Sequence, residues 1–197
     1  MNQEELDIIL ENHGKWLRNE GGERADLSNA DLKNTNLRFA NLRLADLRGA
    51  YLSYANLRGV DLRFADLKNT NLRFANLSYA NLRFADLSYA NLSNADLSNV
   101  NLSNANFRGV DLSDANLNWV NWQHVEGLTV ICVQVDTTRK NNQIAYIKEL
   151  DIWITGCFQG TLDELKASVE QTHKHNEKLK KRYYRVIDFI LNEVEEE

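Results

Sequence analysis

Four histidines and two cysteines are the residues of this sequence whose chemistry suits metal binding or nucleophilic catalysis. The cysteines are Cys132 and Cys157, and the most closely spaced histidines are His173 and His175. Structural zinc sites take their ligands from closely spaced Cys and His residues in recurring patterns, and the spacing here matches none of them. The sequence also contains no HExxH segment, no glycine-rich phosphate loop and no Ser-His-Asp order. It therefore predicts no metal site, no cofactor and no catalytic residues, and the protein is not expected to be an enzyme.

A second set of side chains, which could take part in binding, recurs at intervals of twenty residues. Each member is an arginine followed by a large apolar residue: Arg43-Leu44, Arg63-Phe64 and Arg83-Phe84. An aspartate series has the same interval: Asp26, Asp46, Asp66 and Asp86. If residues twenty apart lie above one another, the arginines repel each other at the spacing of β-strands. We expect the neighbouring aspartates to compensate them, with Arg63 near Asp46 or Asp66.

Aromatic residues accompany the arginines. Tyr54 and Phe74 are also twenty residues apart, and large apolar side chains that repeatedly face solvent can mark a contact surface. Two interpretations stay open: a solvated surface whose charges neutralise one another, or a binding stripe of arginines and exposed rings. The interaction surface under the second interpretation comprises Arg43, Arg63, Arg83, Phe64, Phe84, Tyr54 and Phe74.

The residues that position these side chains form a five-residue repeat. From Ala25 the sequence reads ADLSN, ADLKN, TNLRF, ANLRL and continues to residues 120–124, giving twenty units without an insertion. The third position is Leu in eighteen units, the first is Ala, Val or Thr, and the second is Asn or Asp in all but one. A period of five fits neither an α-helix nor a flat strand, so the backbone must turn a corner every five residues. Four such sides close a coil of twenty residues, and leucine columns such as Leu52, Leu72 and Leu92 should be buried inside it.

This repeat resembles, almost unit by unit, the consensus A(D/N)LXX of the pentapeptide-repeat family. The resemblance covers about half of the chain and implies an all-β solenoid, a right-handed quadrilateral β-helix of about five coils at residues 25–124. We expect most Asp and Asn side chains at the second position to bond local backbone groups at the turns. The segment GCFQGTLDEL at residues 156–165 is similar to endings of phage-type members of the family and implies no activity.

The first end of such a solenoid needs a cover. Residues 1–24 predict an N-terminal capping helix, because apolar residues from Leu6 to Trp16 recur at spacings of three and four. His13 lies in this stripe, and we interpret it as a packed residue of the cap rather than as a ligand.

The five-residue period ends after residue 124, and a small C-terminal α+β region is predicted beyond it. Residues 125–160 predict a β-rich cap with a polar turn at 136–142 and strands at 128–135, 144–147 and 152–158. Residues 161–197 predict C-terminal helices, and Thr161 and Glu164 form a capping box that opens the first of them.

The last helix, at about residues 177–195, carries an apolar stripe that it must bury. We expect the preceding strands to cover the end of the last coil, which leaves the stripe to the same helix of a second copy. This predicts a homodimer with a self-complementary patch, and the alternative is packing within the helix's own chain. The stripe comprises Leu179, Tyr183, Val186, Ile187, Ile190 and Val194.

Charge and hydropathy limit the partners and the location. Residues 25–124 hold nine acids and ten bases, a net charge of +1, whereas residues 1–24 and 125–197 each carry a net charge of −3. No segment has the basic excess that phosphate binding needs, so direct nucleic-acid binding is not expected. No apolar run reaches membrane-spanning length, and the acidic start of the chain is unlike a signal peptide. We expect a cytoplasmic protein without a membrane anchor.

The leading functional hypothesis is a non-catalytic scaffold or protein-interaction protein with an unknown protein partner. The family resemblance implies an alternative, because some members mimic DNA, bind type II topoisomerases such as gyrase and confer quinolone resistance. A DNA mimic needs a strongly acidic rod, and residues 25–124 are nearly neutral. An enzyme domain at 125–197 and an engineered, consensus-like chain are the remaining alternatives.

Overall fold

The structure is a computed structural model that describes residues 1–135 and 143–196. The chain divides into two compact units, Met1–Gly127 and Leu128–Glu197. The polar turn predicted at residues 136–142 lies outside the described residues.

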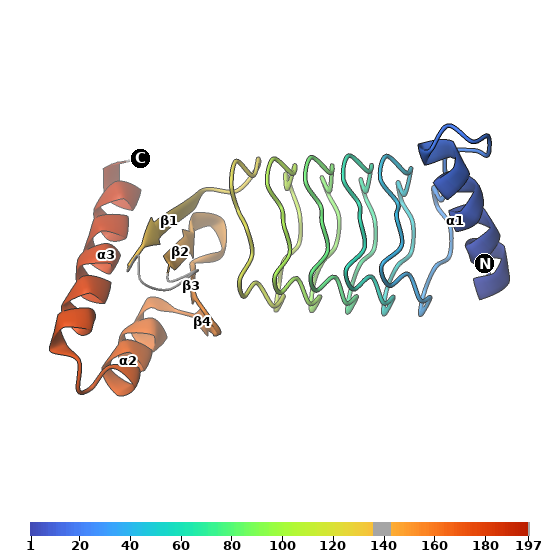
Figure 1. Cartoon of the computed structure of the whole chain (residues 1–197). Helices are drawn as coiled ribbons and strands as arrows, with labels where there is room; N and C mark the ends of the chain where they lie inside the picture. The colour runs from blue at the N-terminus through green and yellow to red at the C-terminus, as the bar shows by residue number, and fades with distance from the viewer. Residues whose placement is uncertain (136–142, 197) are drawn as a thin grey trace. The chain divides into compact units, whose positions relative to one another are not determined.

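In the first unit the five-residue repeat builds a four-sided coil. Each second-position residue pairs in parallel with the residue twenty positions later, from Asp26 and Asp46 through to Asn106 and Glu126. Amide groups carry the pairing; for example, the Leu72 N–H donates to a carbonyl one coil further on at 2.8 Å. Residues twenty apart therefore lie above one another, as predicted, and the coils stack along one axis (Figure 1).

The four sides of the coil can be named from their first units. Side 1 starts at Ala25, side 2 at Ala30, side 3 at Thr35 and side 4 at Ala40, and each recurs every twenty residues. A surface position is then fixed by its side and by its place in the unit, so each fourth or fifth position forms a column along the axis.

The interior of the coil is made by the first and third positions. The predicted leucine columns are buried, with Leu52, Leu72 and Leu92 all at 0% exposure. The two Thr residues at first positions are buried as well, and the hydroxyl of Thr70 donates to the carbonyl oxygen of Leu67 at 2.6 Å. A buried hydroxyl is tolerated when it is hydrogen-bonded in this way.

The second and fifth positions make the turns. The Oδ1 atom of the second residue accepts the N–H two residues later, as in Asn81 with Arg83 at 3.3 Å, which confirms the local role predicted for these side chains. The fifth residue adopts a left-handed backbone, with φ of 59° at both Phe64 and Asn104. Asn and Gly tolerate this conformation, whereas a bulky side chain in it is strained.

Helix α1 (Gln3–Leu17) lies against the start of the β-helix. A capping box opens it, since Asn2 accepts the Glu5 N–H at 2.8 Å and Glu5 accepts the Asn2 N–H at 3.1 Å. Leu6 and His13 are fully buried on its inner face. The amide of Gln3 donates to the Asn36 carbonyl at 3.2 Å, which ties the helix to the first coil.

His13 is fixed between two backbone groups. Its Nδ1 atom accepts the Ala25 N–H at 3.0 Å, so Nε2 carries the proton and donates to the Arg43 carbonyl oxygen at 3.1 Å. Burial lowers the pKa of His13 below its ordinary value; the bond to the Arg43 carbonyl opposes this, and the charges of Arg24 and Arg43 add to the lowering. If the His13 ring were protonated, Nδ1 would become a donor and would face a second donor, the Ala25 N–H.

We expect this helix to loosen in mild acid. Because the folded-state pKa of His13 lies below the unfolded value of about 6.5, the unfolded state takes up the proton first. The stability that His13 contributes is complete above about pH 6.5 and is lost as the pH falls below it. Amide exchange at Ala25, corrected for the intrinsic pH dependence of exchange, should accelerate between pH 7.5 and pH 5.5. An NMR titration that places the His13 pKa at or above 6.5 would contradict this account.

The second unit is a four-stranded antiparallel sheet with two helices. The strand order is β1-β2-β3-β4, with a short 3-10 helix (Lys148–Leu150) between β2 and β3. The strands are β1 (Val130–Gln134), β2 (Gln143–Ile147), β3 (Ile152–Thr155) and β4 (Phe158–Gly160). The helices are α2 (Leu162–Thr172) and α3 (Glu177–Glu196). Thr161 and Glu164 form the predicted capping box at the start of α2.

The single strand predicted at residues 152–158 is wrong. Gly156 adopts a φ of 55°, which turns the chain back, so that Thr155 pairs with Phe158 and two strands form instead of one. Glycine takes this left-handed conformation without strain.

The apolar stripe of α3 packs within its own chain. Tyr183, Ile187 and Ile190 are buried at 7%, 0% and 0% exposure. They lie in one core with residues of the sheet and α2, including Trp153 and Leu165, and the remaining stripe residues pack against that core. The premise that the stripe lacks a cover in its own chain is therefore wrong. The half-buried members of the stripe are Leu179, Val186 and Val194.

Candidate interaction surface

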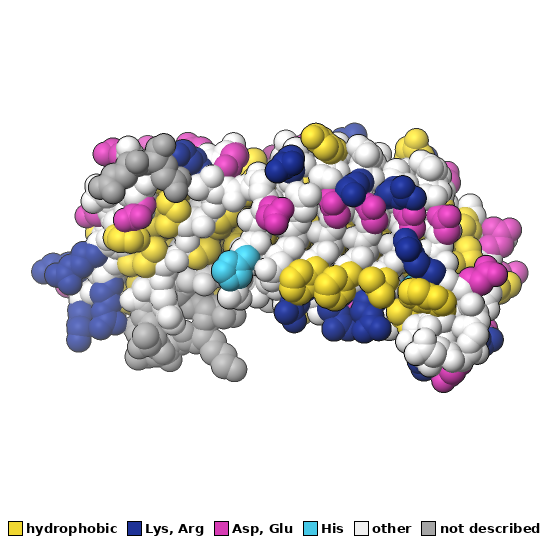
Figure 2. Space-filling view, turned by 90° about the horizontal axis from the view of Figure 1, so that it is seen from above, with side chains coloured by type: hydrophobic (Ala, Val, Ile, Leu, Met, Phe, Trp, Pro, Cys, Tyr) yellow, Lys and Arg dark blue, Asp and Glu magenta, His cyan; other side chains and the backbone are white. Residues whose placement is uncertain are grey.

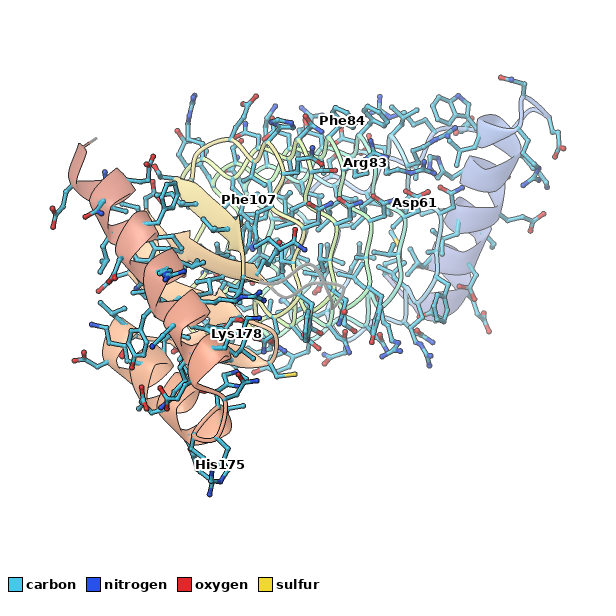
Figure 3. All side chains as sticks on the ribbon, turned by 60° about the vertical axis from the view of Figure 1, so that its left-hand side comes forward. Asp61, Arg83, Phe84, Phe107, His175 and Lys178 are labelled. Carbon is cyan, nitrogen blue, oxygen red and sulfur yellow. The ribbon has the colours of Figure 1, made fainter. Side chains whose placement is uncertain are left out.

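Two of the rings predicted for the interaction surface, Phe64 and Phe84, continue a column on side 4 that begins with Leu44. Leu44, Phe64 and Phe84 occupy its fifth position in three successive coils and are 39%, 50% and 43% exposed. The rings of Phe64 and Phe84 stack with centroids 4.8 Å apart and planes within 1° of parallel. Arg83 and Phe84 lie together on the outside of the β-helix (Figure 3). We call this surface the side-4 ridge, and it comprises Arg43, Arg63, Arg83, Leu44, Phe64 and Phe84.

The apolar members of the ridge are held in strained backbone. Leu44 has a φ of 67°, and Phe64 and Phe84 both have a φ of 59°. A left-handed conformation costs a bulky residue about 1–2 kcal/mol. The same column continues with Asn104 at a φ of 59°, a residue that takes this conformation readily. The ridge therefore keeps large apolar side chains where the turn itself favours Asn or Gly.

Arg63 is compensated by Asp61 and not by the neighbouring aspartate column. Its Nη2 atom lies 2.6 Å from Oδ2 of Asp61, and its Nε lies 2.8 Å from Oδ1. The predicted pairing with Asp46 or Asp66 is wrong. Burial opposes ionisation of the Asp61 carboxyl, but hydrogen bonds from Arg63 outweigh it, so the pKa of Asp61 lies below its usual value. The backbone fixes this pair, because the Arg63 N–H also donates to Oδ1 of Asp61 at 3.2 Å.

The aspartate column pairs instead with bases of its own side. On side 1, Lys68 lies 3.2 Å from Asp86 and 3.6 Å from Asp66, and Arg48 forms an ion pair with Asp46. In Figure 2, a row of hydrophobic side chains runs along the β-helix, with basic side chains on one flank and a row of acidic side chains, accompanied by further basic ones, on the other. Arg43 and Arg83 have no carboxylate within ion-pair distance among the described residues.

The near-neutral net charge of the repeat conceals an uneven distribution. In the first three coils, sides 3 and 4 carry five arginines and one aspartate, a net charge of +4. Sides 1 and 2 of the same coils carry four bases and four acids. Residues 85–124 hold one base and four acids, a net charge of −3. The side-4 ridge thus lies on the positive half of the first three coils.

Side 3 contributes two arginines, Arg38 and Arg58, that sequence reasoning did not include. Arg58 lies over the Tyr79 ring, 4.8 Å from its centroid, a distance at which a cation and an aromatic face attract. The Phe39 ring lies close to Gly59, and a Cβ atom added at Gly59 would lie 2.6 Å from that ring. Arg38 completes the positive side-chain set of side 3. Counting charge on each side, and not along the whole repeat, would have identified these arginines.

Tyr54 and Phe74 form a separate ladder. Their rings stack at 4.8 Å and 6°, and the side chains are 60% and 40% exposed. They occupy side 2, which faces away from side 4 across the four-sided coil. The seven residues predicted as one surface therefore divide into the side-4 group and this side-2 pair.

The described residues contain no metal-binding cluster. Cys132 and Cys157 are exposed free thiols, and His173 stacks on Tyr183 at 5.1 Å. Across residues 1–135 and 143–196, no group of three His, Cys, Asp or Glu side chains is placed to hold a metal ion. None of the helices in the same residues is long and apolar enough to cross a membrane.

Comparison with known proteins shows the family. The family profile described as pentapeptide repeats matches eight copies within residues 25–63, 55–88, 65–104 and 85–121. No curated protein matches the chain. This family profile implies a right-handed β-helix, in agreement with the twenty-residue parallel pairing.

Several solved structures of pentapeptide-repeat proteins are similar to this chain. One from Nostoc PCC 7120 is 35% identical, with 48% of this chain and 81% of that chain covered and a TM-score of 0.40. One from the thylakoid lumen of Arabidopsis thaliana is 31% identical, with 48% and 66% covered and a TM-score of 0.48, so this chain spans just under two thirds of its length. The plasmid-mediated fluoroquinolone resistance protein QnrB1 is 23% identical, with 55% of each chain covered and a TM-score of 0.30. On the family profile and the 35% identity over most of the Nostoc protein, this chain belongs to the pentapeptide-repeat family.

Proposed function

We propose that this protein is a non-catalytic scaffold whose β-helix presents the side-4 ridge to a protein partner. The observation that carries the proposal is that Leu44, Phe64 and Phe84 fill one half-exposed column over three successive coils, on the half of those coils that carries a net positive charge. Their left-handed backbone is shared by fifth-position aromatic residues of the other sides, including Tyr54 and Phe74, so it is a property of the turn and not of this surface. Apolar side chains that form a continuous exposed patch rimmed by polar residues are a feature of protein contact surfaces.

The ridge can be removed without disturbing the coil. Asn104 already occupies the same column, so the double variant Phe64→Asn/Phe84→Asn places a residue there that the turn accepts. Losing the ring stack costs about 0.5–1.5 kcal/mol, and relief of the left-handed strain offsets a similar amount. We expect the free energy of unfolding in urea to stay within about 1 kcal/mol of the unmodified protein. A loss of several kcal/mol would show that the rings hold the fold together.

A matched control is available on the opposite side. The double variant Tyr54→Asn/Phe74→Asn removes the other stacked pair, whose column continues with Asn94. Cross-linking and affinity capture from the native host should recover the same protein with the unmodified chain and with the side-2 variant, and lose it with the side-4 variant. Equal recovery by all three would contradict a role of the ridge.

Binding to gyrase as a DNA mimic is the competing function. A mimic must reproduce the dense negative charge of the duplex, whereas Asp46, Asp66 and Asp86 of side 1 form ion pairs with Arg48 or Lys68. We expect no inhibition or protection of gyrase in a supercoiling assay. An effect that survives loss of the side-4 ridge would favour the competing function.

A further inference from the structure

We propose that the side-4 ridge binds an acidic amphipathic α-helix of the partner, lying along the β-helix axis. This inference rests on the proposed function and names the chemistry of the partner. Three features of the ridge lead to it: the part of the rings that is exposed, the charge that remains unpaired, and the spacing of the coils.

The ridge exposes the edges of its rings. Because Phe64 and Phe84 stack face to face along the column, each covers a face of the other, and their edges turn outward. The edge of an aromatic ring is its electropositive part. Proteins that bind single-stranded nucleic acid stack the bases on exposed faces of aromatic rings. The Phe64–Phe84 stack leaves little of its ring faces free for a base. Carboxylates and aliphatic side chains suit ring edges better, which favours a polypeptide.

The charge of the ridge calls for carboxylates. Asp61 engages Arg63, but no described carboxylate pairs with Arg43 or Arg83. Sides 3 and 4 together keep a net charge of +4 in these coils. Arginine binds carboxylates through paired N–H donors, so a partner with regularly spaced Glu or Asp would compensate this surface.

The spacing of the coils selects a helix over an extended strand. Neighbouring ring centroids on the ridge lie 4.8 Å apart, so three coils span about 9.6 Å from first to last at the strand spacing. Two turns of an α-helix span about 10.8 Å, a mismatch of about 1.2 Å that flexible arginines can absorb. Side chains on one face of a strand recur every ~6.7 Å, so two steps span about 13 Å and lose register by the third coil.

The geometry therefore specifies the partner helix. Carboxylates at i and i+7 lie on one face of a helix and would meet Arg43 and Arg83, on either side of the Asp61–Arg63 pair. An adjacent stripe of Leu, Ile or Met would pack on the apolar column. No basic residues are expected on either stripe.

A synthetic peptide tests this chemistry on the full-length protein. The probe is an alanine-based, fluorescein-labelled 18-residue helix with Glu on one stripe and Leu on the neighbouring stripe. The first control peptide replaces Glu by Gln, and the second has the same composition in alternating, strand-like order. In fluorescence anisotropy we expect the probe to bind at least tenfold more tightly than either control, and to weaken as salt is raised.

Variants locate the binding to the ridge. Arg43→Gln/Arg83→Gln and Phe64→Asn/Phe84→Asn should each weaken probe binding at least tenfold. Arg48→Gln, on the paired side-1 column, and Tyr54→Asn/Phe74→Asn should leave it unchanged. Equal binding of the control peptides, no binding of the probe, or insensitivity to the ridge variants would overturn the proposal.

A labelled deoxythymidine 20-mer distinguishes the nucleic-acid alternative. Ridge-dependent binding of the 20-mer that is tighter than binding of the probe would also overturn the proposal. The two proposals can fail separately: if affinity capture still depends on the ridge while the probe does not bind, the scaffold function stands and the acidic helix is wrong.

Discussion

Leu72→Ala is expected to lower the free energy of unfolding of the first unit by about 2–5 kcal/mol. Leu72 is fully buried in the interior of the β-helix, and its backbone N–H is bonded to the next coil. The coils above and below hold the same column with Leu52 and Leu92, so the walls of the cavity cannot collapse without breaking the parallel pairing. Equilibrium unfolding in urea, followed by far-UV circular dichroism, measures the loss.

The control for this truncation is Leu44→Ala. It removes the same atoms from a fifth-position side chain that is 39% exposed, so little apolar surface returns to water and the cost should stay below about 1 kcal/mol. Equal losses at Leu44 and Leu72 would show that the third position is not the structural core of the repeat.

Ile187→Ala is expected to cost about 2–5 kcal/mol in the second unit. Ile187 is fully buried in the core that α3 shares with β2, β3 and α2. If the stripe served a second copy, its truncation would act through dissociation, and the midpoint of unfolding would depend on protein concentration. We expect the loss at Ile187 to be the same at micromolar and at hundredfold higher concentration.

Phe189→Ala is the matched control on the same helix. Phe189 is 48% exposed, and its truncation should change stability by less than about 1 kcal/mol. Trp153 lies in the same core as Ile187, so its fluorescence reports the unfolding of this unit. If the midpoint of unfolding depended on protein concentration and Ile187→Ala abolished that dependence, the result would support the homodimer through α3.

The sequence predicted the solenoid because its rule is local and repeats. Small first positions, leucine at the third and Asn or Asp at the second recur without a gap, so one unit explains all the others. The buried leucine columns and the stacking of Phe64 on Phe84 follow from that register alone. Residues outside the repeat gave no comparable constraint.

The errors arose where the answer depends on side-chain direction or on distant partners. The Asp61–Arg63 pair lies within one unit. Oδ1 of Asp61 accepts the N–H two residues later, and this hydrogen bond already directs the carboxylate toward the side chain at the fourth position. Reasoning from columns considered only neighbours in space. For α3, the pattern showed a stripe that must be buried but not which surface covers it, since β2 and β3, which contribute buried residues to that core, begin 34 and 25 residues before the helix. The interaction surface itself stays a prediction.

The place of a unit within the twenty-residue coil determines the direction in which its outer side chains point. Residues 30–42 and 65–77 are the same thirteen-residue sequence, ADLKNTNLRFANL, displaced by thirty-five positions. Because thirty-five is not a multiple of twenty, the two copies present identical side chains in different directions. Gain or loss of a single five-residue unit keeps every leucine inside, yet turns all later side chains by a quarter revolution. Such a change would keep the fold and still cut the side-4 ridge in two, so the ridge depends on the number of five-residue units between Leu44 and Phe84 as well as on their sequence.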